Sequence, residues 1–166
     1  MNIFKIIAFT SVLLITQNIY AKTTISHAIA MHGEPKYAED FISVEYISNS
    51  AEKGGAIVRS AIGSYDTFNP FTLKGSSAAG ISLLFESLTL GSSDEAFTEY
   101  GLLARNIEWP EDRSWVSFTL RKEAEWHDGK KITSEDIIWT FNTLMEKGHP
   151  FYGYYYGDIK EVIKIS

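Results

Sequence analysis

The adjacent residues His127 and Asp128 invite a catalytic interpretation, as a general base and the carboxylate that orients it. Neighbouring residues on a turn point apart, however, and no serine or cysteine nucleophile lies in a recognisable elbow motif. We therefore expect no catalytic residue and interpret the pair as part of a turn. A small periplasmic hydrolase that uses His127, Asp128 or a tyrosine is the alternative.

Two other groups of residues raise the question of a metal or a cofactor. His27 and His32 are five positions apart, near Glu34, whereas metal sites favour helical i, i+4 spacing or further ligands at defined intervals. The run Gly75–Gly80 lacks the Gly-Lys-Ser/Thr ending of a nucleotide-binding loop. We expect no metal and no cofactor, and we expect the two histidines to form a surface pair.

The run of Lys74, Gly75, Ser76 and Ser77 is the first candidate ligand-binding segment. It precedes a predicted helix, so its backbone N–H groups could bind an anionic or carbonyl-rich ligand. The ammonium group of Lys74 could meet a carboxylate. An ordinary capped loop is the alternative.

The aromatic cluster Phe151–Tyr156 is the second candidate segment. Tyrosine rings combine apolar area with a hydroxyl group, which suits a cleft that binds variable peptides. If the segment is extended, Tyr154 and Tyr156 share one face and Tyr155 takes the other. We therefore predict Tyr154 and Tyr156 as ligand contacts, with packing between structural elements as the alternative.

The region between these segments carries strong local signals for two strands and two turns. Leu103–Trp109 and Trp115–Arg121 alternate in the way that half-buried strands do, and Pro110–Arg113 suits the turn between them. A second turn is predicted at His127–Lys130, where the glycine after aspartate can take a positive φ.

A helix is predicted to begin at Thr133, because its side chain can cap the first turn together with Asp136. Gly148 and Pro150 are expected to end this helix. An apolar stripe at helical spacing predicts that one face of the helix packs on a core. The stripe consists of Ile137, Ile138, Phe141, Leu144 and Met145.

Four further segments carry signals for secondary structure. They predict a strand at Ile57–Tyr65, a helix at Ser77–Leu88, an aromatic loop at Phe151–Asp158 and a last strand at Ile159–Ile165. Mixed strands and helices in this order predict an α/β (mixed α+β) fold.

Three runs, Phe118–Arg121, Trp126–Lys130 and Thr133–Ile137, resemble a signature of the family 5 extracellular solute-binding proteins. These proteins are the peptide, dipeptide and nickel receptors of bacterial ABC importers. Upstream, Gly54–Arg59 resembles the first strand of the family, and Tyr65–Pro70 resembles the segment that follows it.

The resemblance covers roughly Ile25 to Ser166. Leu84–Leu88 looks like the end of the helix that follows in the family. Ser26–Glu34 and Tyr152–Tyr156 are most similar to the Yej-type oligopeptide receptors.

The resemblance implies a fold, a function and partners. Family members fold as two lobes that close on a ligand by a hinge motion and then dock on a permease. This implies an oligopeptide-binding component of an ABC transporter, which contains part of the first lobe. The implied partners are a peptide ligand, an inner-membrane ABC permease, and a second polypeptide that supplies the missing lobe. A ligand-free remnant protein is the alternative.

Residues 1–21 are interpreted as a signal peptide, with Lys5, the short apolar run Ile6–Ile15, and Ala21 at the expected cleavage point. An uncleaved membrane anchor is the alternative, although the run is shorter than the ~20 residues of a spanning helix. The chain has no cysteine, which argues against lipid attachment and leaves no disulfides. Together these features favour a Gram-negative periplasm.

The charge of the chain argues against nucleic acid as a partner. Without Lys5, 14 lysines and arginines stand against 21 acidic residues, which gives a net charge of −7.

We expect three parts: the signal peptide at 1–21, an N-terminal leader at 22–51, and an incomplete first lobe at 52–166. Val162–Ser166 falls inside a predicted strand, so we expect the N-terminal portion of a longer protein. A split gene, a truncated gene and a cloned fragment are the possible origins. We expect such a partial lobe to bind peptide weakly or not at all by itself.

Overall fold

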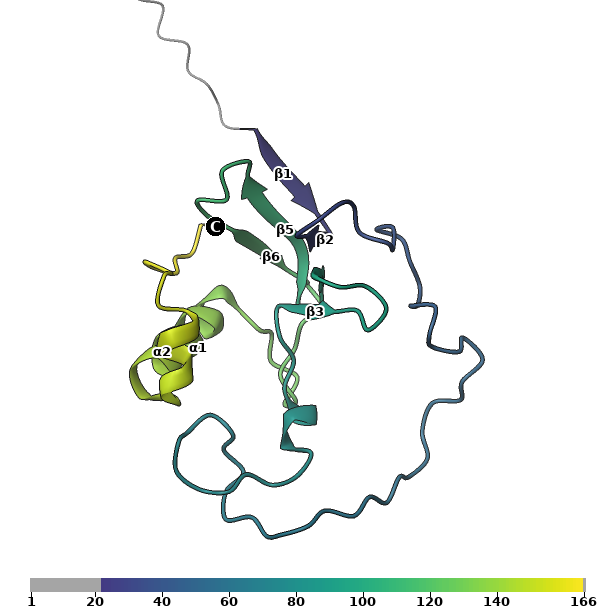
Figure 1. Ribbon diagram of the computed structural model, residues 1–166, viewed down its shortest axis with the longest axis vertical. Coiled ribbons are helices and arrows are strands. Elements are labelled where there is room, and N and C mark those ends of the chain that lie inside the picture. The colour runs from purple at the N-terminus through teal and green to yellow at the C-terminus, as the bar shows by residue number, and fades with distance from the viewer. Residues whose placement is uncertain (1–21, 166) are drawn as a thin grey trace, which may run out of the picture.

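The computed structural model describes residues 22–165, so the predicted signal peptide lies outside the described residues. Within this range the chain forms two small antiparallel sheets and two helices (Figure 1). One sheet has the order β1-β5-β6 and the other has the order β2-β4-β3. The strands are β1 (Thr23–Ser26), β2 (Ala28–Ala30), β3 (Thr89–Gly91), β4 (Thr98–Gly101), β5 (Ala104–Pro110) and β6 (Ser117–Leu120). The helices are α1 (Ser134–Lys147) and α2 (Pro150–Tyr155), and Ile81–Leu84 forms a short 3-10 turn.

Two segments of the chain, residues 23–30 and 98–110, each contribute one strand to each sheet and thereby join the sheets. β1 and β2 follow each other along the chain, and they pair antiparallel with β5 and β4, respectively. Both segments pass from one sheet to the other at a shared corner, where the Gly101 N–H donates to the His27 carbonyl at 2.8 Å. Ala104 and Ile107, just beyond this corner, are fully buried. A second buried cluster contains Ala28, Tyr37 and Tyr100.

The predicted hairpin is confirmed. β5 and β6 pair antiparallel, and the connection between them closes through the Arg113 N–H, which donates to the Pro110 carbonyl at 3.0 Å. The Asp112 carboxylate accepts the Ser114 N–H at 3.0 Å, as an aspartate in a turn commonly does.

The predicted turn and helix after the hairpin are also confirmed. Gly129 has a φ of 83°, and the Asp128 carboxylate accepts the Lys130 N–H at 3.1 Å. Thr133 and Asp136 form a reciprocal capping box at the start of α1. The Gly148 N–H donates to the Leu144 carbonyl at 3.0 Å at the end of that helix.

Three predicted elements are absent from the described part of the chain. Ile57–Tyr65 and Ile159–Ile165 are not strands, and Ser77–Leu88 contains only the 3-10 turn at Ile81–Leu84. Ile57 and Val58 are 88% and 98% exposed. No neighbouring strand pairs with their backbone, and an isolated strand or helix gains too little from local interactions to form. In Figure 1 the long connection between β2 and β3 runs as an open arc outside the sheets.

The range that we expected to be an N-terminal leader contributes strands to both sheets. β1 and β2 fall within 22–51, and the Tyr37 side chain is buried against Tyr100. These residues are therefore joined to the sheets rather than separate from them, and the domain boundary at residue 52 stays a prediction.

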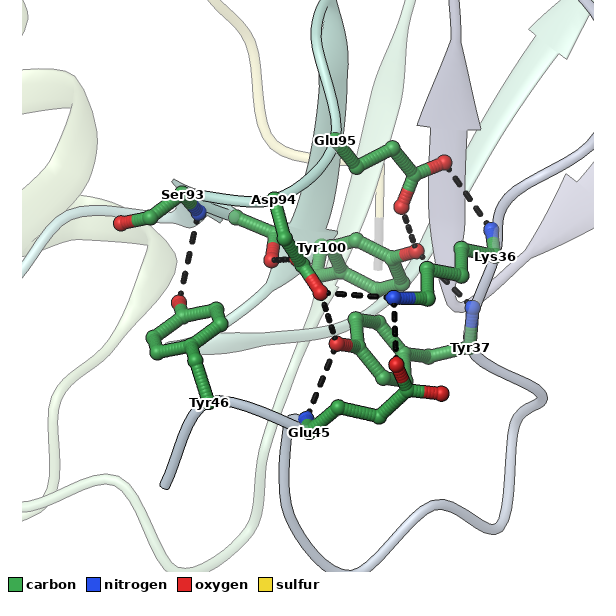
Figure 2. A network of polar contacts seen from close by, with 9 residues as sticks. Lys36, Tyr37, Glu45, Tyr46, Ser93, Asp94, Glu95 and Tyr100 are labelled. Carbon is green, nitrogen blue, oxygen red and sulfur yellow. Dashed lines mark hydrogen bonds and ion pairs between the residues drawn. The ribbon is translucent and has the colours of Figure 1, made fainter.

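A network of polar side chains connects residues 36–46 with the β3–β4 connection (Figure 2). The ammonium group of Lys36 lies 2.7 Å from Asp94 and 2.8 Å from Glu45. The Tyr37 hydroxyl donates to Asp94 and accepts the Glu45 N–H. The Tyr100 hydroxyl accepts the Tyr37 N–H at 3.1 Å. No local sequence signal indicated this network, because its members are far apart in the chain.

The network perturbs the titration of its central ion pair. Hydrogen bonds from Lys36, then Ser92 and Tyr37, hold the pKa of Asp94 well below its usual range. Hydrogen bonds to Asp94 and Glu45 raise the pKa of Lys36 above its usual range.

Acid is expected to loosen the N-terminal range. Because the pKa of Asp94 is lower in the folded state, its contribution is present above the ordinary aspartate pKa of about 4 and is lost as the pH falls further. The raised pKa of Lys36 has the opposite dependence, since its contribution is lost only as the pH rises through the alkaline range. Amide hydrogen exchange at Glu45, followed from pH 7 to pH 3 and corrected for intrinsic rates, should show falling protection. An Asp94→Asn variant should start lower and change little, and equal acid loss in both proteins would contradict the assignment to Asp94.

Gly129 is expected to be required for its backbone conformation and not for space. A Cβ atom there would meet nothing within 4 Å, yet the φ of 83° is one that side chains disfavour. Gly129→Ala should therefore reduce the free energy of unfolding by about 1–2 kcal/mol in urea titrations followed by circular dichroism. The matched control is Gly153→Ala in α2, where φ is not positive and a Cβ also meets nothing. That change should leave stability unchanged or raise it by about 0.5–1 kcal/mol, and an equal loss in both variants would contradict the prediction.

Candidate functional site

The predicted ligand segment Lys74–Ser77 lies in a closed loop. The Asp66 N–H donates to the Ser76 carbonyl at 3.0 Å, and the Ser76 N–H donates back to the Asp66 carboxylate at 2.7 Å. The Ala78 N–H donates to the Thr67 carbonyl at 3.0 Å. The structure thus uses the Ser76 N–H inside the loop, and Ser76 as a ligand contact stays a prediction.

Gly75 allows the two ends of this loop to approach. Its φ is 97°, and a Cβ atom would lie 2.8 Å from the Asp66 carboxylate and 2.9 Å from the Thr67 methyl group. We predicted that a helix begins after this loop, but the loop precedes only the 3-10 turn at Ile81–Leu84. The helix N-terminus that would bind a ligand is therefore absent at this point in the described chain. Lys74 is exposed at the loop, and the ion pairs found within residues 22–165 do not include it.

The aromatic segment is helical and not extended, contrary to the prediction of a loop. Pro150 occupies the first turn of α2, where its fixed φ and missing N–H are tolerated, and His149 caps the helix. In a helix the aromatic rings pair at i, i+4 spacing. Phe151 stacks on Tyr155 with ring centroids 5.2 Å apart, and Tyr152 is parallel to Tyr156 at 6.5 Å.

Tyr154 and Tyr156 consequently do not share a face, as the extended geometry had required. Tyr154 is 89% exposed, whereas Tyr156 is 38% exposed and its ring lies 6.2 Å from that of Phe141 in α1. Of the two predicted contacts, Tyr154 is the freer to meet a ligand. Tyr156 packs against α1, in line with the alternative interpretation of the cluster.

The structure brings the loop and the aromatic helix into direct contact. The His149 N–H donates to the carbonyl of Phe71, a residue of the loop, at 2.7 Å. Sequence reasoning had assigned no role to His149. The signal was nevertheless present, because a polar residue directly before proline is a common start of a helix.

The histidines singled out from the sequence have structural partners. His27 is half-buried, and its Nε2 atom donates to the Tyr37 carbonyl at 2.8 Å, so the expectation of two surface histidines is wrong for His27. His32 is exposed and meets the Phe97 ring edge-on. Within residues 22–165 no group of three or more His, Cys, Asp or Glu side chains could hold a metal ion.

His127 and Asp128 lie in the turn before α1. Asp128 closes this turn through its bond to the Lys130 N–H and its ion pair with the Lys130 ammonium group at 2.7 Å. His127 is exposed. The carboxylate is thus engaged by the turn itself, which supports a structural role.

A shallow hollow at the end of the β1-β5-β6 sheet contains none of the predicted ligand residues, and it is lined by Lys22, Thr24, Trp109, Glu111 and Arg113. No helix within the described residues combines the length and apolar character needed to cross a membrane.

Comparison with known proteins identifies the relatives of this chain. The family model described as bacterial extracellular solute-binding proteins, family 5 Middle, matches residues 98–166. The chain is 45% identical over 132 residues to the peptidoglycan-binding protein YepA of Agrobacterium fabrum, which covers 75% of the chain and 22% of YepA.

Two further relatives are named YejA. The chain is 38% identical over 125 residues to an uncharacterised YejA protein of Escherichia coli, which covers 75% of the chain and 21% of that protein. It is 35% identical over 127 residues to the probable peptide-binding protein YejA of Agrobacterium fabrum, which covers 76% of the chain and 21% of that protein. The chain therefore spans about a fifth of the length of the curated relatives that it matches.

The matched range contains the hairpin, the turn and the capped helix that the structure shows between β5 and α1. It is a family of binding proteins and not of enzymes, as we expected from the sequence. Residues 98–166 of this chain therefore match the bacterial extracellular solute-binding proteins of family 5.

Proposed function

We propose that this chain forms part of the first lobe of a periplasmic oligopeptide receptor that serves an ABC importer. The observation that carries the proposal is the match of residues 98–166 to the solute-binding family. One relative of the chain is named a probable peptide-binding protein, which supports a peptide as the ligand. The permease of the importer is the partner that the bound receptor would meet.

A peptide derived from peptidoglycan is a second candidate ligand. The relative that shares 45% identity with the chain is named a peptidoglycan-binding protein. Such a ligand would still offer peptide carbonyl, amide and carboxylate groups. The same protein surface therefore suits both candidates, and the experiments must separate them.

The exposed loop and helix provide the groups that a peptide needs. Lys74 offers a positive charge without an ion-pair partner among the described residues, and Tyr154 offers an exposed ring with a hydroxyl group. Ser77 and Gly75 lie beside Lys74 in the closed loop. We propose these residues as one side of a peptide site, with the loop that carries Lys74 held against the α1–α2 junction.

One lobe alone is expected to bind a peptide with low affinity, because a peptide cleft buries its ligand between two surfaces. Calorimetry of the chain from Lys22, titrated with mixed short peptides, should therefore show no binding in the micromolar range. The same titration should give micromolar binding once a second polypeptide supplies the region of YejA that this chain does not span. Micromolar binding by the chain alone would refute the need for a second polypeptide. An absence of binding in both cases would refute the peptide-receptor proposal, and a preference for peptidoglycan peptides over ordinary ones would favour the second ligand.

Lys74 is expected to bind the carboxylate of the peptide. In the completed receptor, Lys74→Met should weaken binding of a peptide with a free C-terminus by about twofold to fivefold, which is the usual range for an exposed ion pair. It should not affect the same peptide with an amidated C-terminus. Lys122→Met is the matched control, since Lys122 is exposed and lies outside the proposed site. Equal effects of the two lysine changes, or equal effects on both peptides, would remove Lys74 from the site.

A further inference from the structure

Two of the hydrogen bonds of His149 reach different segments of the chain. Its backbone N–H donates to the Phe71 carbonyl of the closed loop at 2.7 Å. Its side-chain Nδ1 atom accepts the Phe151 N–H of α2 at 3.1 Å. One half-buried residue therefore contacts both segments that carry the proposed ligand contacts.

The imidazole ring supplies a cap that α2 would otherwise lack. The first N–H groups of a helix have no partner within the helix. Pro150 has no N–H, so Phe151 carries the first one that needs an acceptor. Nδ1 accepts a hydrogen bond only when it carries no proton, which places the proton of the neutral ring on Nε2. The ring thereby fixes the start of α2 and the direction of the helix that presents Tyr154.

On the other side, Phe71 is itself fixed within the loop. Its N–H donates to the Asn69 side chain at 2.9 Å, and its ring packs edge-on against Phe85 with centroids 4.8 Å apart. The loop is closed beyond this point by the bonds between Asp66 and Ser76. A restraint on the Phe71 carbonyl is therefore also a restraint on the segment that carries Lys74.

We propose that His149 is a positioning residue that holds the Lys74–Ser77 loop and the aromatic helix α2 in a fixed relative placement. Its importance for ligand binding rests on the proposed function. The placement itself does not, so it can be tested without any ligand. Loss of the link would leave both segments folded but free to move relative to each other.

The backbone of His149 permits a substitution that removes only the link and the cap. Its φ of −56° and ψ of 138° are values that proline adopts, and they also suit a residue that precedes proline. His149→Pro removes the N–H and the side-chain cap together. His149→Ala keeps the N–H and removes the cap, and His149→Asn keeps the N–H and can restore a cap. Comparison of the proline and alanine variants thus isolates the bond to Phe71.

The absence of native cysteine makes a direct distance measurement possible. Spin labels are attached to the full chain at Lys74→Cys and Tyr154→Cys, and their distance distribution is measured by pulsed electron resonance. The distribution should be narrow in the His149, His149→Ala and His149→Asn backgrounds. It should become broad in His149→Pro. A control pair at Trp139→Cys and Tyr154→Cys, which reports on α1 and α2 alone, should remain unchanged by His149→Pro.

Hydrogen exchange provides a second readout in the unlabelled chain. His149→Pro should speed exchange of the bonded amides of Ser76 and Ala78 by about tenfold relative to His149→Ala, as expected for loss of one anchoring hydrogen bond. A broad label distribution in the unchanged background, or equal behaviour of the proline and alanine variants in both measurements, would overturn the proposal. Neither measurement involves a peptide, so their failure would leave the proposed receptor function standing, and a failure to bind peptide would leave the positioning role standing.

Discussion

The backbone pairing of residues 23–30 with residues 98–110 is the constraint on which the rest of this structure depends. It creates the central contacts of both sheets, because β5 lies between β1 and β6 and β4 lies between β2 and β3. The corner that both strands share buries Ala104 and Ile107. It also places Tyr100 where Tyr37 can pack on it, and the polar network of Lys36 and Asp94 then follows. Without this pairing, only the separate β5–β6 and β3–β4 pairs would be left of the two sheets.

The helices depend on this framework much less than the strands do. Neither α1 nor α2 contains a buried residue, and Phe141 of the apolar stripe packs against the ring of Tyr156, just after α2. The residues of that stripe are only half-buried, so the prediction that this face packs on a core is not confirmed within residues 22–165. Exposed rings such as Trp139, at 69%, mark the same surplus of apolar surface. A chain with so much uncovered area has a strong physical reason to associate with further polypeptide.

Sequence reasoning succeeded where a structure is decided by neighbouring residues. The Pro110–Arg113 connection, the Asp128-Gly129 turn and the Thr133 capping box each depend on contacts within a few positions. It failed where distant contacts decide, as at Ile57–Tyr65, where the predicted strand has no partner strand within residues 22–165. For the candidate site, the sequence identified the loop and the aromatic cluster as segments of interest. The helix signal of His149 before Pro150 was present but was not used. The bond between Ser76 and Asp66 and the bond between His149 and Phe71 join distant residues, so no local pattern could reveal them.

The long separation between the paired strands also dictates an order of events during folding. The β5–β6 hairpin needs only a short turn, and such hairpins form within about 1–10 μs. Thr23 can pair with Pro110 only after the whole intervening chain has been made and its loop has been closed, which is a slow, high-contact-order step. Until then β5 presents an unpaired edge of the kind that recruits other chains into aggregates. β1 therefore covers the exposed edge of β5, although its pairing with β5 is a late step in folding.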